Sequence, residues 1–190
     1  MPKFTFIIPS YKNYFVLGRC LDSICSQTEK DYEIIVVNDG VDPQIRNIVS
    51  EGGSKARYYE HPYVGRRGGF QSIALGIAQA KGEFVYILNS DNIIYPTFIE
   101  EMYCSESHIL TCQVQMNDIP GVILHGKTYV QGRFDRANYA ILSSVAKEVD
   151  YKDFPMQQDD YHFFIACYDN IDKKGQPIIH HVDRVLAEHN

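Results

Sequence analysis

Residues 32–40 read YEIIVVNDG, a run of apolar residues that ends in an amide, a carboxylate and a glycine. Its apolar residues follow one another without alternation, which is typical of a strand buried on both faces of a parallel sheet. Residues 4–11 (FTFIIPSY) and 83–92 (EFVYILNSDN) have the same form. The sequence therefore predicts buried strands that run directly into polar side chains.

The segments between these strands have the spacing of amphipathic helices. Residues 14–26 and 70–78 carry apolar side chains at helical intervals. Asp42 followed by Pro43 predicts the start of another helix, and residues 56–59 a short strand. Alternating strands and helices predict an α/β fold, with a mainly parallel central sheet and helices on both faces.

The second half of the chain is less regular. We expect strands at 108–116, 122–130 and 177–182, and helices at 135–148 and 159–168. The chain has no repeat, no low-complexity stretch and no linker, so residues 1–190 are interpreted as one domain.

Composition excludes several classes of protein. The net charge of −6 argues against a nucleic-acid binder that relies on phosphate attraction. Five cysteines without CxxC spacing predict neither a disulfide scaffold nor a zinc site, and they favour a reduced, cytoplasmic protein. The first residues lack the features of a signal peptide, and no apolar segment reaches the ~18 residues that span a bilayer. We expect any membrane association to be peripheral, through a partner or a surface patch.

Polar residues follow each of the three buried strands. The carboxyl ends of parallel strands meet at one edge of a sheet, and ligands of α/β proteins bind there. This rule brings Ser10, the pair Asn38 and Asp39, and the pair Ser90 and Asp91 to the same edge.

Two carboxylates at this edge each have two interpretations. Asp39, before a glycine, is either a turn residue that caps backbone amides or an acceptor for the N–H of a base. Asp91 is either a loop and helix cap or a ligand of a divalent cation that bridges two phosphates. The residues alone leave both choices open.

The order of these motifs resembles the family 2 glycosyltransferases, which have the A-type nucleotide-diphospho-sugar transferase fold. FIIPSYKNYFVLGRCLDSICSQTEKDYEIIVVNDG (6–40) and GIAQAKGEFVYILNSDNIIYP (76–96) carry the resemblance, which thins after Tyr103. It implies an inverting, metal-dependent enzyme that transfers a sugar from a nucleotide-diphosphate donor, a UDP-sugar, to an acceptor hydroxyl. The implied cofactor is Mn²⁺ or Mg²⁺.

The resemblance also assigns nucleotide-binding residues. Pro9, Ser10 and Tyr11 match the first nucleotide-contacting loop of the family, with Tyr11 beside the base. Asp39 matches the second aspartate of an Asp-Asp-Gly turn, which reads the uracil ring. Asn38 stands at the first aspartate, so contacts to ribose or base are expected to differ.

The metal and phosphate residues match less completely. Asp91 matches the last aspartate of the family's DxD motif, the metal ligand, and Ser90 stands in place of the preceding aspartate. The Arg-Asn pair of the family is absent, with Ile73 and an alanine in its place. Arg66 and its neighbour Arg67 either supply charge for the phosphates or are solvated loop residues.

The resemblance places the chemistry of the second half on two residues. By register Asp160, within Asp159-Asp160-Tyr161, is the general base that activates the acceptor hydroxyl. In the alternative interpretation, the aspartate pair begins a helix, and its negative charge interacts favourably with the helix dipole. His189 stands where some members place a histidine on metal or phosphate, and it is a second predicted metal ligand.

These assignments divide the chain into a nucleotide-sugar-binding half (1–103) and an acceptor-side half (104–190). The expected acceptor is a carbohydrate or lipid-linked glycan in polysaccharide biosynthesis. A nucleotide-sugar-binding module without turnover is the alternative, because Ser90, Asn38 and the missing Arg-Asn depart from the pattern. A phospho-accepting receiver domain fits poorly, since it needs acidic residues near Ser10.

Overall fold

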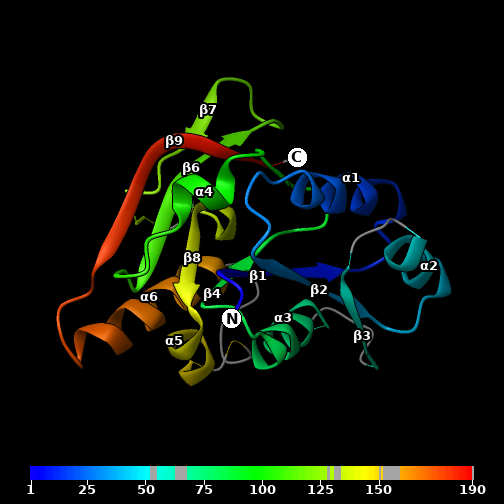
Figure 1. Cartoon of the computed structure of the whole chain (residues 1–190), viewed down its shortest axis with the longest axis horizontal. Helices are drawn as coiled ribbons and strands as arrows, with labels where there is room; N and C mark the ends of the chain where they lie inside the picture. Colours follow the sequence, from blue (N-terminus) through cyan, green and yellow to red (C-terminus); the bar gives the residue numbers. More distant parts are fainter. Residues whose placement is uncertain are drawn as a thin grey trace.

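The computed structural model describes residues 1–51, 55–62, 68–127, 129–130, 134–149, 151 and 159–189. Within these residues the chain forms one nine-stranded sheet with helices on both faces (Figure 1). The strand order is β3-β2-β1-β4-β8-β6-β9-β5, and β7 pairs with β6 outside this path. The predicted α/β architecture is confirmed.

The first half of the chain builds the parallel part of the sheet. Its strands are β1 (Phe4–Ser10), β2 (Tyr32–Asp39), β3 (Arg57–His61) and β4 (Phe84–Ile87). Its helices are α1 (Tyr14–Cys25), α2 (Pro43–Glu51) and α3 (Gly68–Gln79). All pairings among β1, β2, β3 and β4 are parallel, as the apolar runs predict. Helix α3 begins two residues before the expected stripe.

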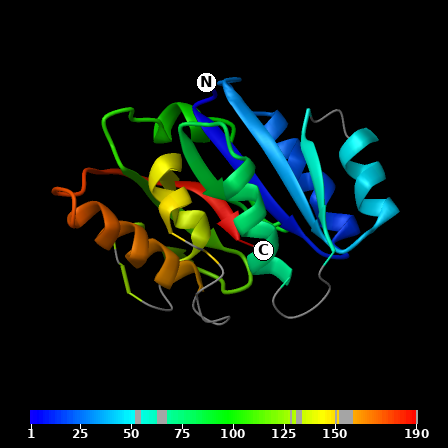
Figure 2. The same ribbon diagram turned by 90° about the horizontal axis from the view of Figure 1, so that it is seen from below.

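Alternate residues of β1 enter two different cores. Phe6 and Ile8 are buried in a cluster that includes residues of α1, α2 and Phe98. Ile7 points to the other face, where it packs with Ile73 and other residues of α3, α5 and α6. Figure 2 shows these helices separated by the sheet. The period of two along the strand therefore sets which helix covers which face.

The second half of the chain is mixed. Its strands are β5 (Ile93–Ile94), β6 (Ile109–Met116), β7 (Val122–Leu124), β8 (Tyr139–Leu142) and β9 (Ile179–His189). Its helices are α4 (Phe98–Met102), the 3₁₀ turn η1 (Arg136–Asn138), α5 (Ser143–Glu148) and α6 (Asp159–Asp172). Strands β6 and β9 are parallel, and the remaining pairings here are antiparallel.

The prediction of a helix at residues 135–148 is wrong. The segment forms η1, then β8, and only then the short helix α5. Strand β8 lies between β4 and β6, and three of its four residues are buried. A short apolar run buried on both faces cannot be told from a helical segment by periodicity. The strand expected at 122–130 also ends earlier, at Leu124, while β9 extends to His189.

The strand order places a crevice beside β1. The chain adds β2 and then β3 on one side of β1, and β4 lies on the other side. Loops that leave neighbouring strands in opposite directions separate there, and ligands of α/β proteins bind in the space between them.

Two other expectations concern the whole chain. The five cysteines are all unpaired, in agreement with the absence of a disulfide scaffold. In the described ranges, no helix combines the length and the apolar character that crossing a bilayer requires.

Candidate active site

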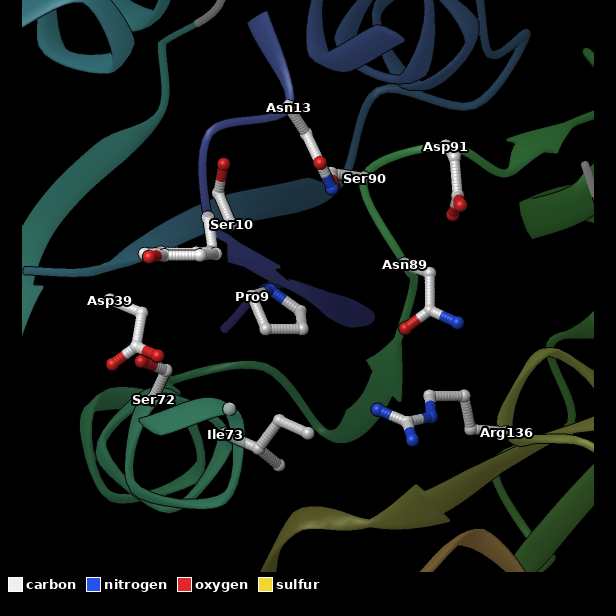
Figure 3. Close-up of a pocket in the computed structure, with 12 residues that line it drawn as sticks. Pro9, Ser10, Asn13, Asp39, Ser72, Ile73, Asn89, Ser90, Asp91 and Arg136 are labelled. Carbon is white, nitrogen blue, oxygen red and sulfur yellow. The ribbon is translucent and has the colours of Figure 1, made fainter. Parts of the chain in front are cut away.

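A pocket of about 560 Å³ opens at the carboxyl end of the parallel strands, in the crevice beside β1. This volume is within the range of small-molecule sites. Figure 3 shows the side chains that line it, which come from the ends of β1 and β2, the segment after β4, α3 and η1. They are Pro9, Ser10, Tyr11, Asn13, Asp39, Gly69, Ser72, Ile73, Asn89, Ser90, Asp91 and Arg136.

The loop after β1 contributes three predicted residues, Pro9, Ser10 and Tyr11. Ser10 is buried, and its Oγ has no hydrogen-bond partner among the described residues. Tyr11 is 45 % exposed. The ammonium group of Lys12 lies 5.2 Å from the centroid of the Tyr11 ring, and this cation–π contact helps to position the ring. This loop therefore offers a hydroxyl and an aromatic face to a ligand.

Asp39 is the carboxylate at the end of β2. Its side chain is buried, and its Oδ1 accepts no hydrogen bond from the described part of the chain. Burial raises the pKa of Asp39 above its ordinary value, and the nearby His61 opposes this shift. A buried carboxylate oxygen without a donor is costly, so a ligand that brings an N–H group would be bound favourably there.

Asn38 has a different position from its neighbour. It is buried but is not among the lining residues. Its Nδ2 donates a 2.8 Å hydrogen bond to the carbonyl oxygen of Gly40, a residue with φ of 98° that only glycine adopts readily. Asn38 thus stabilises the turn that contains Asp39.

The segment after β4 supplies Asn89, Ser90 and Asp91. The backbone N–H of Asn92 donates a 3.0 Å hydrogen bond to the backbone carbonyl oxygen of Asn89, so this tip forms a turn. Ser90 is buried, and its Oγ accepts a 2.6 Å hydrogen bond from Nδ2 of Asn13. Asn89 and Asp91 have the two-residue spacing of a DxD motif, with an amide in the first place. Sequence reasoning missed Asn89, although this spacing was the available signal.

The first turns of α3 form another wall. Gly69, Ser72 and Ile73 line the pocket. Ser72 is fully buried, and its Oγ has no partner among the described residues. Figure 3 shows Ser72 and Ile73 on α3, across the pocket from the tip that carries Asp91. Ser10, Asp39 and Ser72 therefore each bring to the pocket a polar atom that has no partner among the described residues.

The opposite end of the pocket is cationic. Arg136 of η1 lines it, and in Figure 3 the guanidinium group points into the cavity. The same group forms an ion pair with Asp160 in the first turn of α6. The side chains of Arg136 and Asp160 are only 14 % and 22 % exposed. Asp160 is not a lining residue itself, but it contacts Arg136, which is.

His189 is a further predicted residue, and it is not among the described lining residues. His189 is at the end of β9, with Nδ1 3.8 Å from Oδ2 of Asp135. The pairing of β5 with β9 sets Ile93 opposite Glu188, so His189 follows in the direction of the tip that carries Asp91. Arg66 lies outside the described residues.

The donor atoms at the tip fit one kind of cation. Among the described residues no group of three or more His, Cys, Asp or Glu side chains gathers to hold a metal ion. Asp91 offers one carboxylate, and Asn89 lies two residues away on the same wall. Mg²⁺ is commonly held by one or two carboxylates, with phosphate oxygens and water as its other ligands. The tip suits such an ion and does not resemble a zinc cage.

Bacterial proteins are similar to about half of this sequence. An uncharacterized glycosyltransferase of Rickettsia typhi is 35% identical over 99 residues, which are 52% of this chain and 30% of that protein. The glycosyltransferase GlyA of Streptococcus pneumoniae is 34% identical over 104 residues, 53% of this chain and 14% of that protein. The match therefore spans less than a third of the length of these relatives.

Solved structures share the fold over nearly the whole chain. TarS of S. aureus (residues 1–349) superimposes with a TM-score of 0.78 at 20% identity, covering 99% of this chain and 60% of that one. The mannosyltransferase PcManGT of Pyrobaculum calidifontis gives 0.68 at 15% identity, covering 99% and 56%. These likenesses establish a glycosyltransferase fold.

The family assignment rests on the sequence. Residues 5–104, more than half of the chain, match the profile described as glycosyl transferase family 2. The matched range contains Pro9, Ser10, Asp39 and Asp91, which the pocket brings together. The chain belongs to glycosyl transferase family 2.

Proposed function

We propose that this chain is the catalytic domain of an inverting glycosyltransferase, which transfers a sugar from a UDP-sugar to an acceptor hydroxyl. The observation that carries the proposal is that Asp39 and Asp91, far apart in sequence, line one pocket at the carboxyl end of the sheet. Structures of TarS contain UDP and UDP-GlcNAc, and that of PcManGT contains GDP-Man and Mn²⁺, so proteins of this fold bind such donors.

The nucleoside of the donor occupies the Asp39 end of the pocket. Oδ1 of Asp39 accepts the N–H of the base, which gives the buried oxygen the donor that it lacks in the chain itself. The half-exposed ring of Tyr11 lies beside the base. Ser10 and Ser72 offer buried hydroxyl groups to the nucleoside.

The diphosphate lies between Asp91 and Arg136. Asp91 and Asn89 would hold a Mg²⁺ or Mn²⁺ ion, with His189 as a further candidate ligand from the end of β9. When bound, such an ion supplies positive charge to the diphosphate leaving group, which then departs without a proton. Arg66, outside the described residues, remains a candidate for phosphate binding.

Asp160 is the proposed general base. It accepts the proton of the acceptor hydroxyl while the oxygen forms a bond to the anomeric carbon of the sugar. The bond from that carbon to the phosphate oxygen breaks, and its electron pair stays on the diphosphate. Attack from the face opposite the leaving group inverts the configuration at the anomeric carbon.

The two halves of the chain divide the substrates. Residues 1–103 provide most of the nucleotide-sugar site, whereas residues 104–190 add Arg136 beside the diphosphate, carry Asp160 and receive a carbohydrate or lipid-linked glycan. The unpaired cysteines suit a reducing compartment, so the proposed location is the cytoplasm, with any membrane association through a partner.

A nucleotide-sugar-binding module without turnover is the second candidate. It is favoured by the amide at Asn89 and by the ion pair that engages Asp160. Release of UDP from a panel of UDP-sugars, with glycan acceptors and with Mn²⁺, Mg²⁺ or a chelator, separates the two. Acceptor-stimulated release supports the transferase, whereas tight UDP binding with no release across the panel supports the binding module.

A further inference from the structure

Building on the proposed function, we propose that the guanidinium group of Arg136 binds the donor diphosphate and Asp160 at the same time, and so positions the general base relative to the leaving group. The group lines the pocket, points into it in Figure 3, and forms an ion pair with Asp160. A guanidinium group has five N–H donors on two edges, so it can bind a phosphate while it keeps a carboxylate. Arg136 is thus a positioning residue for Asp160.

The charges of the described lining residues favour a contact between the diphosphate and Arg136. Among these residues Asp39 and Asp91 are carboxylates, and Arg136 carries the positive charge. A diphosphate with one divalent ion still keeps negative charge. Because arginine binds phosphate through two parallel hydrogen bonds, Arg136 suits the diphosphate better than any other described lining residue.

The width of a guanidinium group matches the distance that the reaction needs between base and leaving group. A base lies about 3 Å from the attacking hydroxyl, and this oxygen about 3–3.5 Å from the reacting carbon, so base and leaving oxygen are roughly 5–7 Å apart. A guanidinium group that donates from two edges holds its two acceptors roughly 5–7 Å apart as well. Asp160 contacts Arg136 without lining the donor pocket, as this arrangement requires.

The backbone of Arg136 is anchored by the residues around it. Oδ1 of Asn138 accepts a 2.8 Å hydrogen bond from the backbone N–H of Asp135. Nδ2 of Asn138 donates to the backbone carbonyl oxygens of Cys112 and Leu124, each at 3.0 Å. These bonds attach η1 to β6 and β7, so the side chain of Arg136 extends from a fixed point.

Asp160 is anchored to the same segment. The hydroxyl of the buried Tyr139, which directly follows η1, donates a 2.8 Å hydrogen bond to the backbone carbonyl oxygen of Asp160. This bond does not use the carboxylate. A carboxylate has about four lone-pair sites, so an ion pair with Arg136 leaves it able to accept the proton of a hydroxyl. One short segment therefore holds both partners of the ion pair.

Arg136→Lys separates positioning from charge. Lysine can bind a phosphate as a point charge, but it lacks the rigid second edge that holds Asp160. UDP affinity, measured by calorimetry in MgCl₂, should fall by less than about tenfold. Turnover at saturating UDP-sugar should fall by roughly ten- to a hundredfold, the cost of misplacing a catalytic group by about 1 Å. Wild-type turnover in Arg136→Lys overturns the positioning role.

The same change in the Asp160→Asn background shows which partner Arg136 acts on. No base remains to be positioned there, so Arg136→Lys should lower the residual turnover by less than about twofold. An equal loss in both backgrounds means that Arg136 acts on the leaving group alone, and it overturns the positioning role. Arg184→Lys is the matched control, because Arg184 pairs with Glu101 at 2.6 Å and is not a described lining residue. It should change neither UDP affinity nor turnover.

A wild-type crystal with UDP and MgCl₂ gives the answer if Arg136→Lys does not fold. The guanidinium group of Arg136 should then contact a phosphate oxygen and the carboxylate of Asp160 in the same complex. A complex in which either contact is missing overturns the positioning role alone. Wild-type protein that binds no UDP overturns the proposed function itself.

Discussion

Nδ2 of Asn13 donates a 2.6 Å hydrogen bond to Oγ of Ser90, which joins the loop after β1 to the tip after β4. Ser90 is buried, so its hydroxyl depends on this donor. The bond fixes the distance between the two walls of the pocket that carry Tyr11 and Asp91.

Loss of this bond should loosen the pocket. Asn13→Ala is expected to lower the free energy of unfolding by about 1 kcal/mol and to weaken Mg²⁺–UDP binding, because the buried Ser90 loses its partner. Denaturant unfolding and calorimetry measure the two effects. If Asn13 acts through Ser90, the losses in Asn13→Ala and Ser90→Ala will not add in the double variant. Full additivity would show that the bond does not couple the loops.

Asp91 should carry the metal dependence of nucleotide binding. Asp91→Asn keeps the shape of the side chain but removes the charge that a hard cation needs. We expect the variant to bind UDP with the same weak affinity in Mg²⁺ and in chelator, whereas the wild type binds more tightly with Mg²⁺. Asp22→Asn, at an exposed position of α1, is the control. Wild-type titration curves that coincide with and without metal would remove Asp91 as a ligand.

We expect the buried carboxylate of Asp39 to lower the stability of the folded chain at neutral pH and to strengthen UDP binding. Because burial raises its pKa, the folded chain holds this proton more tightly than the unfolded chain. The favourable contribution is present below the ordinary pKa of about 4 and is lost as pH rises through the folded pKa. Asp39→Asn should therefore raise the Tm by a few degrees at pH 7.5, with a smaller gain toward pH 4, and should weaken UDP binding.

The pKa of Asp183 is shifted in the opposite direction, so this residue serves as a comparison for Asp39. Its pKa is lowered by a hydrogen bond from Gln113 and by the charge of Lys127. Asp183→Asn should not raise the Tm at pH 7.5, and UDP binding should be unaffected. Thermal scans from pH 4 to pH 8 give both profiles. An Asp39→Asn variant that is less stable than wild type at pH 7.5 contradicts the assigned cause.

Two helical glycines should respond in opposite directions to alanine. A Cβ on Gly18 of α1 meets no atom within 4 Å, so Gly18→Ala should stabilise the chain by about 0.5–1 kcal/mol through helix propensity. A Cβ on Gly76 of α3 would lie 2.4 Å from Cγ2 of the buried Ile7. Gly76→Ala should destabilise by about 1–3 kcal/mol, since α3 must move away from β1. Urea unfolding measures both, and a stabilised Gly76→Ala would refute this close packing.

Asp160 should be needed for transfer and not for nucleotide binding. Asp160→Asn cannot accept a proton, so turnover with saturating donor should fall by roughly 10²–10⁴-fold while UDP still binds. Asp172→Asn, exposed at the other end of α6, is the control. Turnover at the wild-type rate in Asp160→Asn would remove this residue as the base.

The side of the pocket that carries Ser10, Asp39 and Asp91 could be predicted from the sequence because its signals are local. Buried parallel strands are continuous apolar runs, and the residues after them meet at one edge of the sheet. Ser10, Asp39 and Asp91 line one pocket, as this rule predicts. Asn89 differs from the first aspartate of a DxD motif by one amide, so only its spacing from Asp91 indicates it.

The opposite wall could not be predicted in the same way. Arg136 lies in a 3₁₀ turn that precedes β8, whereas the sequence pattern predicts one helix over both. The position of β8 between β4 and β6 depends on pairings between distant segments, which local periodicity does not contain. The ion pair of Arg136 with Asp160 depends on that placement. The residue that faces the proposed diphosphate was therefore accessible only from the structure.

A crystal structure of the chain with UDP and Mn²⁺ would show whether Asp39 and Asp91 bind opposite ends of one nucleotide. We expect the uracil to lie against Asp39 beside Tyr11, and a Mn²⁺ ion to join the diphosphate to Asp91. UDP bound at another surface, or with its diphosphate toward Asp39 and its base toward Asp91, would contradict it.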